Sequence, residues 1–301
     1  MKHNRDFDPR YGEAVELTSG LRRLTARNPS PFTFLGTNTY LIGTRRLVVV
    51  DPGPNLEEHV GAILKAAEGA RIEAIVVSHT HADHSPGARL LKERTGAPIV
   101  GCGPHRAARD LMEDEVNPLD ASGDKEHEPD TLLGDGEVLR AAGLSLETIE
   151  TPGHTANHLC FALPGENILF SADHVMGWAT TIVAPPDGSM RDYMASIEKL
   201  QHRPETCYLP GHGGEINNAL DYVRDLKQHR LSREASILAE LNQGSRTIPE
   251  VVAALYADVD PRLHKAAGLS VFAHLEDLVG RDLVTASPRL SLSSSFSVAS
   301  R

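Results

Sequence analysis

Four side chains that can bind a metal ion lie within six consecutive positions: His79, His81, Asp83 and His84. They follow an apolar run, 75–78, that is typical of a buried strand. Because residues two apart on an extended strand end point the same way, His79 and His81 can converge on one cation. Asp83 and His84 lie past the bend, where a second cation can sit roughly 3.5–4 Å from the first. Neutral imidazole and carboxylate suit Zn²⁺, so the segment predicts a zinc site.

Three more candidate ligands, His154, Asp173 and His212, each follow a strand candidate. His154 and His212 come directly after a Pro-Gly pair, which is a strong turn signal. Taken singly, each is more typical of a turn with an incidental polar residue. Together with the first cluster they complete two coordination spheres, so the joint pattern predicts a dinuclear centre.

The first 230 or so residues alternate short apolar runs with turns and amphipathic stretches. The strand candidates cover 32–42, 47–51, 72–78, 99–100, 144–151, 158–163, 168–171 and 207–210. Apolar residues at helical spacing predict helices over 56–68, 88–95 and 190–200, with Asn55 as the N-cap of the first. Strands mixed with helices in this way predict an α/β layered domain.

Strand signals almost vanish after residue 219. Helices are predicted over 220–241, 251–256 and 263–279, the second behind a capping box from Thr247 to Glu250, and a short strand over 283–286. Three helices and a β-ribbon predict a small winged-helix module. The expected division is a catalytic domain over 1–228, a winged-helix-like domain over 229–290 and a loose Ser-rich tail over 291–301.

In chain order, Asp51, the run His79–His84, His154, Asp173 and His212 resemble the five motifs of the metallo-β-lactamase superfamily. The resemblance implies a four-layer αβ/βα sandwich with the metals at one edge. It also implies the ligand roles: His79, His81 and His154 on a first zinc, Asp83, His84 and His212 on a second, and Asp173 bridging the two. Asp51 resembles the buried carboxylate that holds the ligand loop and does not itself bind metal.

The segments 36–43, 153–159, 192–200 and 229–234 resemble the β-lactamase-like-protein-2 branch of that superfamily, which also ends in a winged helix. Two departures from other branches matter. Zinc β-lactamases of the best-known subclass have Cys where this chain has Asp173, and oxygen-reducing di-iron members have an acidic residue in place of His81. We therefore expect neither penicillin-type hydrolysis nor redox iron.

Two Zn²⁺ ions, with Mn²⁺ or Fe²⁺ as alternative ions, would lower the pKa of bound water to near 7 and so create a hydroxide nucleophile. Asp83 is the candidate catalytic residue, because it can orient the hydroxide and shuttle its proton; plain ligation is the equally weighted alternative. His158, His174, Asn38 and Tyr40 are weaker candidates for substrate contacts, with a hydrogen-bonded structural role as the alternative.

The predicted function is a dinuclear zinc hydrolase that acts on a phosphodiester in single-stranded RNA or on a small ester or thioester. RNA is considered because animal members of the branch resemble single-strand endoribonucleases. One alternative is a glyoxalase-II-like thioester or lactone hydrolase. An alternative of another class is a winged-helix nucleic-acid-binding protein whose metal site is structural. Residues 229–290 carry seven Lys and Arg against eight Asp and Glu, a balance unlike that of a nucleic-acid groove.

Composition limits the class of protein further. The chain has 301 residues, 40% of them hydrophobic, and a net charge of −11, which argues against bulk electrostatic binding to nucleic acid. No apolar run approaches the roughly 18 residues of a membrane span, and the start resembles no secretory signal. We expect a cytoplasmic protein with a small-molecule or RNA substrate, no membrane association and no stable DNA partner; an oligomer is compatible with the sequence.

Two other features need an interpretation. Residues 113–136 carry nine Asp and Glu with little apolar periodicity, which favours a solvated loop, with a lid beside an active site as the alternative. The three cysteines are widely spaced, which excludes a disulfide scaffold, and Cys102 and Cys160 are interpreted as small buried hydrophobes.

Overall fold

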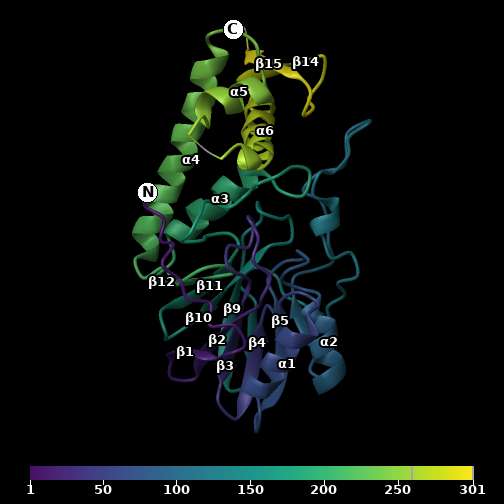
Figure 1. Ribbon diagram of the computed structural model, residues 1–301, viewed down its shortest axis with the longest axis vertical. Coiled ribbons are helices and arrows are strands. Elements are labelled where there is room, and N and C mark those ends of the chain that lie inside the picture. The colour runs from purple at the N-terminus through teal and green to yellow at the C-terminus, as the bar shows by residue number, and fades with distance from the viewer. Residues whose placement is uncertain (259, 300–301) are drawn as a thin grey trace.

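Two β-sheets lie face to face in the larger part of the molecule (Figure 1). The structure is a computed structural model and describes residues 1–258 and 260–299. The first sheet is antiparallel from β1 to β4 and parallel from β4 to β7. Its strands, in spatial order, are β1 (Val15–Thr18), β2 (Leu21–Thr25), β3 (Asn38–Gly43), β4 (Arg46–Val50), β5 (Arg71–Val77), β6 (Ile99–Gly101) and β7 (Thr131–Leu132).

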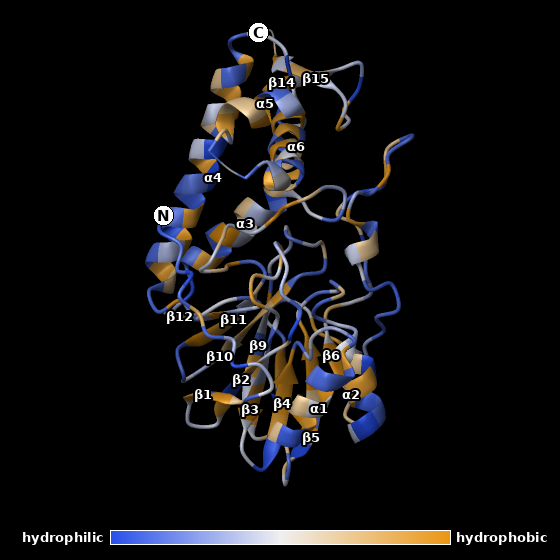
Figure 2. Cartoon of the chain, viewed as in Figure 1, coloured by the Kyte–Doolittle hydropathy of each residue, from blue (hydrophilic) through white to orange (hydrophobic). Residues whose placement is uncertain are grey.

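The second sheet has the spatial order β12-β11-β10-β9-β8 and pairs β11 with β12 in parallel. Its strands are β8 (Val138–Ala141), β9 (Leu144–Glu150), β10 (Leu159–Leu163), β11 (Ile168–Ala172) and β12 (Cys207–Pro210). The main core lies between the two sheets, where the rings of Tyr40 and Phe170 meet with centroids 5.2 Å apart. Figure 2 shows that the strands of this core are largely hydrophobic.

Two helices cover the outer face of each sheet, which confirms the predicted four-layer αβ/βα sandwich. Helices α1 (Glu57–Ala66) and α2 (Gly87–Thr95) pack on the first sheet, and α3 (Met190–Gln201) and α4 (Ala219–Leu241) on the second. The expectation that Asn55 caps α1 is wrong. The N-cap residue is Leu56, which makes no side-chain cap, and the first turn instead carries Glu57 and Glu58, whose charge suits a helix N-terminus.

The strand predicted over 32–42 begins only at Asn38. A turn precedes it, in which Phe34 and Gly36 adopt φ angles of +55° and +131°. A Cβ on Gly36 would lie 2.0 Å from the carbonyl oxygen of Ala26, so this position requires glycine. The close backbone approach prevents the extended conformation from starting earlier.

The predicted winged-helix module is present at the C-terminal end of the chain (Figure 1). Its elements beyond α4 are β13 (Arg246–Thr247), α5 (Ile248–Leu255), the 3₁₀ turn η2 (Pro261–Leu263), α6 (His264–Gly280), β14 (Val284–Ser287) and β15 (Ser295–Val298). The predicted capping box exists, since the Glu250 carboxylate accepts a hydrogen bond from the backbone N–H of Thr247 at 2.7 Å. Helix α4 runs unbroken through position 228, so one helix belongs to both parts of the molecule.

The Ser-rich segment predicted to be a loose tail contains strand β15 instead. Phe296 is fully buried in the core of the C-terminal module, and Val298 pairs with Val284 in the three-stranded sheet β13-β15-β14. The burial of Phe296 and the pairing of β15 with β13 and β14 hold the segment, although serine dominates its composition. Within the described residues, no helix combines the length and the apolar character that crossing a bilayer requires.

Candidate metal centre

All seven predicted ligands lie at one edge of the sandwich, just beyond the C-terminal ends of strands. The run His79–His84 follows β5, His154 follows β9, Asp173 follows β11 and His212 follows β12. The parallel pairs β4–β5 and β11–β12 each end at this edge, which is the usual place for sites in sheets of this kind. The fold therefore brings together side chains that are up to about 130 positions apart in the chain.

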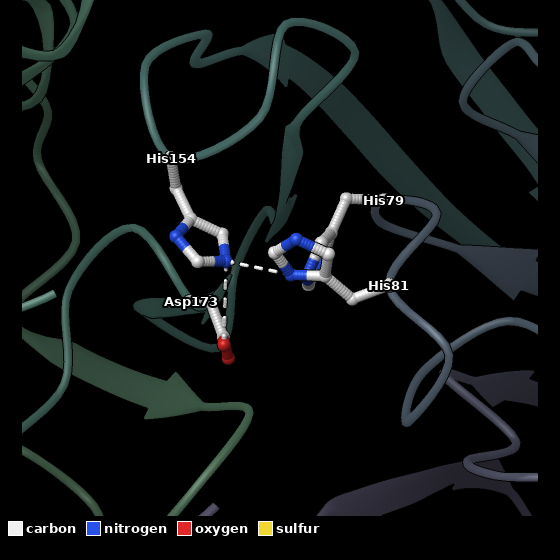
Figure 3. Close-up of side chains that lie close together, drawn as sticks. All are labelled: His79, His81, His154 and Asp173. Atoms are coloured by element: carbon white, nitrogen blue, oxygen red, sulfur yellow. Dashed lines mark hydrogen bonds and ion pairs between the residues drawn. The ribbon is translucent and has the colours of Figure 1, made fainter. Parts of the chain in front are cut away.

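The first group consists of His79, His81 and His154, whose rings face one another (Figure 3). Nδ1 of His81 lies 3.1 Å from Nε2 of His79 and 2.9 Å from Nε2 of His154. Nδ1 of His154, the outer nitrogen that points away from the group, donates to the carbonyl oxygen of Ile182 at 2.7 Å. Its inner nitrogen, Nε2, which points into the group, therefore carries a lone pair. Ring nitrogens that converge with inward lone pairs form the arrangement that a bound cation stabilises.

The second group consists of Asp83, His84 and His212. Oδ2 of Asp83 lies 3.4 Å from Nε2 of His84 and 3.2 Å from Nε2 of His212. The outer nitrogens have acceptors of their own: Nδ1 of His212 lies 3.2 Å from the carbonyl oxygen of Gly36, and Nδ1 of His84 lies 3.0 Å from Oδ2 of Asp51. Both inner nitrogens are therefore available to a cation.

Asp173 lies between the two groups. Its Oδ2 is 3.6 Å from Nε2 of His154 and 3.3 Å from Nε2 of His212, and its Oδ1 is 3.4 Å from Nε2 of His84. The side chain is buried, and Oδ1 has no hydrogen-bond partner among the described residues. A buried carboxylate oxygen whose contact is an ion pair at 3.4 Å, with no hydrogen bond, would be stabilised by a closer cation. This position fits the bridging role that the resemblance implies.

The donor chemistry of the two groups fits divalent cations. Each group offers three protein ligands, and Asp173 adds a carboxylate oxygen between them. Imidazole and carboxylate are ligands that Zn²⁺ prefers, and the ligand atoms within each set lie within 4.8 Å of one another. Both sets are therefore candidate sites for a metal ion.

Asp51 supports the loop that carries His79 to His84 and belongs to neither of the two ligand groups. Its Oδ1 accepts the backbone N–H of Ser78 at 2.8 Å, and its Oδ2 accepts the Ser78 hydroxyl at 2.7 Å and Nδ1 of His84. The carboxylate thus joins the end of β4 to the end of β5 and contacts His84 at its outer nitrogen. This geometry matches the supporting role implied for Asp51.

The two groups differ in protonation when protons are the only cations present. Burial lowers the pKa of His81 to about 3, so this ring stays neutral. Burial alone would also lower the pKa of His212, but Asp173 and Asp83 raise it to about 9. Burial opposes ionisation of Asp83, but the charges of His84 and His212 and the hydrogen bonds from both rings together hold the pKa of the carboxyl well below its ordinary value. A cation must therefore displace protons from the second group.

His158 and His174 lie behind the ligands and do not line the cavity described below. Nδ1 of His158 lies 2.8 Å from the hydroxyl of Thr151, and its Nε2 accepts the backbone N–H of Asp173 at 3.3 Å. The ring of His174 packs between those of His158 and Tyr193, and burial lowers its pKa to about 3. The hydrogen-bonded structural alternative therefore fits His158, whereas His174 is a buried ring held by packing, since its ring nitrogens have no hydrogen-bond partner among the described residues.

Asn38 and Tyr40 are also buried supports and do not contact the cavity. Nδ2 of Asn38 donates to the carbonyl oxygens of Pro210 and Gly213 at 3.1 and 2.8 Å. The hydroxyl of Tyr40 donates to the same Pro210 oxygen at 2.7 Å. These bonds hold the end of β12 from both sides of His212.

Thr37 is a site residue that the sequence interpretation missed. Its hydroxyl donates to Oδ2 of Asp83 at 3.1 Å and accepts from Nδ2 of Asn28 at 2.9 Å. Thr37 lies inside the segment 36–43 that the family resemblance singled out, so a signal was present. Its role depends on the position of Asp83, which only the tertiary structure shows.

A cavity of about 380 Å³ opens over the two groups of ligands. His81, Asp83, His154, Asp173 and His212 lie at its base, and its polar walls include Ser30, Thr33, Ser122 and Asp187. Its apolar walls come from Phe32, Ala82, Leu119, Ala121, Met176, Ile182 and Ala184. Sequence reasoning found none of these wall residues, because they come from separate irregular segments without a motif.

The acidic segment 113–136 takes part in this wall. Residues 119, 121 and 122 line the cavity, and Asp124 is buried, where it pairs with Arg89 at 2.8 Å. The favoured prediction of a solvated loop is thus only partly right, since one stretch of the segment borders the candidate site.

Comparison with known proteins agrees with this geometry. Residues 32–212 match the family described as the Metallo-beta-lactamase superfamily, and residues 247–289 match the Beta-lactamase associated winged helix domain. A Beta-lactamase-like protein 2 homolog from Caenorhabditis elegans is 32% identical over 252 residues, which cover 82% of this chain and 80% of the relative.

Two further similarities are more distant. An Atrochrysone carboxyl ACP thioesterase from Aspergillus chevalieri is 26% identical, with 86% of this chain and 80% of that protein covered. The crystal structure of a metallo-beta-lactamase family protein from Thermus thermophilus superposes with a TM-score of 0.75 at 23% identity, covering 94% of this chain and 100% of that one. The chain therefore belongs to the metallo-beta-lactamase superfamily, as a metal-dependent hydrolase that carries the associated winged helix.

Proposed function

We propose that this protein is a dinuclear metal hydrolase that cleaves a thioester or ester whose acyl part is apolar. The observation that carries the proposal is the cavity over the two ligand groups. Its walls are largely apolar, and no Lys or Arg belongs to its described lining.

The size and walls of the cavity favour an acyl group. A volume of about 380 Å³ lies within the range of small-molecule sites, roughly 300–1,000 Å³. Met176, Ile182 and Ala184 line the same cavity as the ligands and offer apolar contact, and so does Phe32, which is 51% exposed. Each CH₂ group that an acyl chain buries here would contribute about 0.8 kcal/mol.

The same lining disfavours RNA as the substrate. A phosphodiester chain brings one negative charge per nucleotide, and sites for single strands combine Lys or Arg with exposed aromatic rings. This cavity instead adds Asp187 to the carboxylates of Asp83 and Asp173. The near-neutral balance of residues 229–290 likewise gives the nucleic-acid-binding alternative no support.

The named thioesterase among the relatives supports the proposal, since its similarity extends over both parts of this chain. Two zinc ions, or other divalent ions, would supply the chemistry of an activated water and of an electrophile for the carbonyl oxygen. The chain itself holds the ligand histidines by hydrogen bonds to their outer nitrogens and orients Asp83 through Thr37. It also offers the acyl group an apolar wall.

The test combines metal analysis with a substrate panel. Purified protein is expected to contain two divalent ions, and a chelator is expected to abolish hydrolysis. The panel comprises N-acetylcysteamine thioesters with acetyl, hexanoyl and decanoyl chains, matching p-nitrophenyl esters, single-stranded RNA, bis-p-nitrophenyl phosphate and a β-lactam. We expect kcat/KM to rise with acyl length. Turnover of RNA or of the phosphodiester alone would refute the acyl proposal, and activity that persists in the metal-free protein would refute the metal centre.

A variant pair locates the acyl group. Leu119→Ala removes part of the cavity wall and is expected to lower kcat/KM for the decanoyl thioester about tenfold while leaving the acetyl thioester nearly unchanged. Leu132→Ala is the matched control, because Leu132 is an exposed leucine outside this cavity. Equal effects of both variants would contradict the proposed position of the acyl chain.

A further inference from the structure

Helix α4 contacts the peptide segment behind the metal centre through the buried side chain of Arg230. We propose that Arg230 is a positioning residue: it fixes the peptide segment 181–182, which in turn holds the ligands His154 and Asp173. This inference rests on the proposed metal centre. It gives the C-terminal module a role in holding the ligands and none in contacting substrate.

The segment 181–182 makes direct contact with two ligands. The hydroxyl of Thr181 donates to the backbone oxygen of Asp173 at 2.6 Å and lies 3.2 Å from that of His174. The carbonyl oxygen of Ile182 accepts Nδ1 of His154 at 2.7 Å. The bond from Nδ1 to Ile182 leaves Nε2 of His154 with a lone pair. A shift of the segment would therefore move Asp173, and it would also release the proton of His154 from Nδ1.

Arg230 holds this segment from the far side. Its Nη2 donates to the backbone oxygen of Thr181, and its guanidinium lies over the ring of Tyr193, 4.9 Å from the centroid. The hydroxyl of Tyr193 donates to the backbone oxygen of His174 at 2.9 Å, so both contacts of Arg230 lead to the same loop. The arginine is only 4% exposed.

The contacts of Arg230 explain why this position needs arginine. Its guanidinium meets a carbonyl oxygen and an aromatic face, and neither of these contacts is with a carboxylate. A planar guanidinium can donate in its plane and stack at the same time, whereas the compact ammonium of lysine cannot do both. Lysine is therefore not a conservative replacement here.

The position of Arg230 on α4 connects the centre to the C-terminal module. Val223 and Leu226, before it on the helix, pack against the second sheet and α3, whereas Ile237 and Leu241, after it, belong to the core of the C-terminal module. The module thus clamps the far end of the helix that carries Arg230. Figure 1 shows α4 running along both parts of the molecule.

The chain offers a close control in Arg233, one helical turn later. Its guanidinium lies 4.1 Å from the centroid of Tyr256, and its Nη1 donates to the backbone oxygen of Leu255 at 3.1 Å. The chemistry is the same as for Arg230, but both contacts lie inside the C-terminal module, away from residues 181–182.

The experiment compares R230K and R230Q with R233K and R233Q in the full chain. Zn²⁺ affinity is measured by competition with a chromophoric chelator, the ligand field by the d–d spectrum of the Co²⁺-loaded protein, and stability by thermal unfolding. We expect both Arg230 variants to lose about 10–100-fold in Zn²⁺ affinity and to change the Co²⁺ spectrum. Both Arg233 variants are expected to keep the wild-type affinity and spectrum, even where they lower Tm equally.

A second variant keeps the proposal testable if replacement of Arg230 prevents folding. Thr181→Val keeps the shape of the side chain but removes the bond to Asp173, and we expect the same loss of Zn²⁺ affinity. Wild-type affinity in T181V or in the Arg230 variants, or an equal loss in the Arg233 variants, would overturn the inference. Failure of the wild-type protein to bind Zn²⁺ or Co²⁺ would instead refute the proposed metal centre itself.

Discussion

Nδ1 of His84 lies 3.0 Å from Oδ2 of Asp51, and this contact decides which nitrogen of His84 faces the metal centre. The carboxylate can only accept, so Nδ1 keeps its proton, and a metal ion that displaces the second proton of the ring meets the lone pair of Nε2. We predict that D51N reverses this. The amide keeps its oxygen on the Ser78 N–H and presents its N–H to Nδ1, which places the proton on Nε2.

We expect D51N to lower the affinity for the metal ion of the second group, which contains His84, by about 10–100-fold. The ion of the first group should bind normally. Isothermal titration with Zn²⁺ would resolve the two steps. A variant that binds both ions as tightly as the wild type would show that Asp51 does not select the tautomer of His84.

Thr37→Val tests whether Asp83 orients the attacking water or is only a ligand. The variant keeps the side-chain shape, removes the hydrogen bond to Oδ2 of Asp83 and leaves Nδ2 of Asn28 unpaired. It should cost about 1–3 kcal/mol of stability. If Asp83 orients the water, kcat falls about tenfold or more at full metal occupancy, because the carboxylate gains freedom. Thr37→Ser restores the hydroxyl and should restore kcat; a loss of metal with unchanged kcat per bound metal would favour plain ligation.

Gly211→Ala should disable the metal centre without a change in backbone conformation. An added Cβ would lie 2.3 Å from Oδ1 of Asp173 and 2.6 Å from Cε1 of His84, so two predicted ligands would have to move. We expect the metal content, measured by plasma emission spectrometry, to fall by at least one ion per chain while the far-UV circular dichroism stays unchanged.

Gly61→Ala is the control for this substitution. Gly61 lies in the middle of α1 with nothing within 4 Å of its added Cβ, so alanine there should stabilise the protein by about 0.5–1 kcal/mol and leave the metal content unchanged. Full metal content in G211A would mean that the ligands tolerate a shift of this size.

His59 should make the protein less stable as the pH falls. Its Nε2 lies 2.8 Å from the hydroxyl of Thr39, and burial lowers its pKa from 6.5 to about 4. The unfolded chain therefore takes up a proton below pH 6.5, whereas the folded protein does so only near pH 4. The contribution of neutral His59 to the free energy of unfolding is therefore complete above pH 6.5 and decreases as the pH falls from 6.5 to about 4. At pH 5 it is about 2 kcal/mol smaller than at neutral pH.

His59→Gln keeps a donor for Thr39 but cannot titrate. We expect its free energy of unfolding, measured with guanidinium chloride in the presence of a chelator, to fall less between pH 7 and pH 5 than that of the wild type. The exposed His202→Gln serves as the control and should show the wild-type difference. A variant H59Q with the wild-type pH dependence would contradict the assignment.

Local patterns in the sequence predicted the candidate ligands, a layered α/β domain and most of the elements, whereas the four-layer order and the ligand roles came from the family resemblance. His79 to His84, His154, Asp173 and His212 each follow a buried strand, and the apolar character of that strand is visible without any tertiary information. The capping box at Thr247 could be predicted for the same reason, since its two partners are three positions apart. Strands β1 and β2 were missed, because exposed and charged residues interrupt their apolar pattern.

Only the tertiary structure decided which atoms face the centre and what surrounds it. Asp51 decides which nitrogen of His84 faces the centre, and Thr37 orients Asp83. Arg230 fixes the segment that holds His154. Each of these supporting residues is at least 30 positions away from the residue that it supports. The cavity walls likewise come from separate loops. A strand and the ligand that follows it are adjacent in the sequence, so a local pattern can predict both. Hydrogen bonds and cavity walls depend instead on which distant residues come close in space, and no local pattern predicts that.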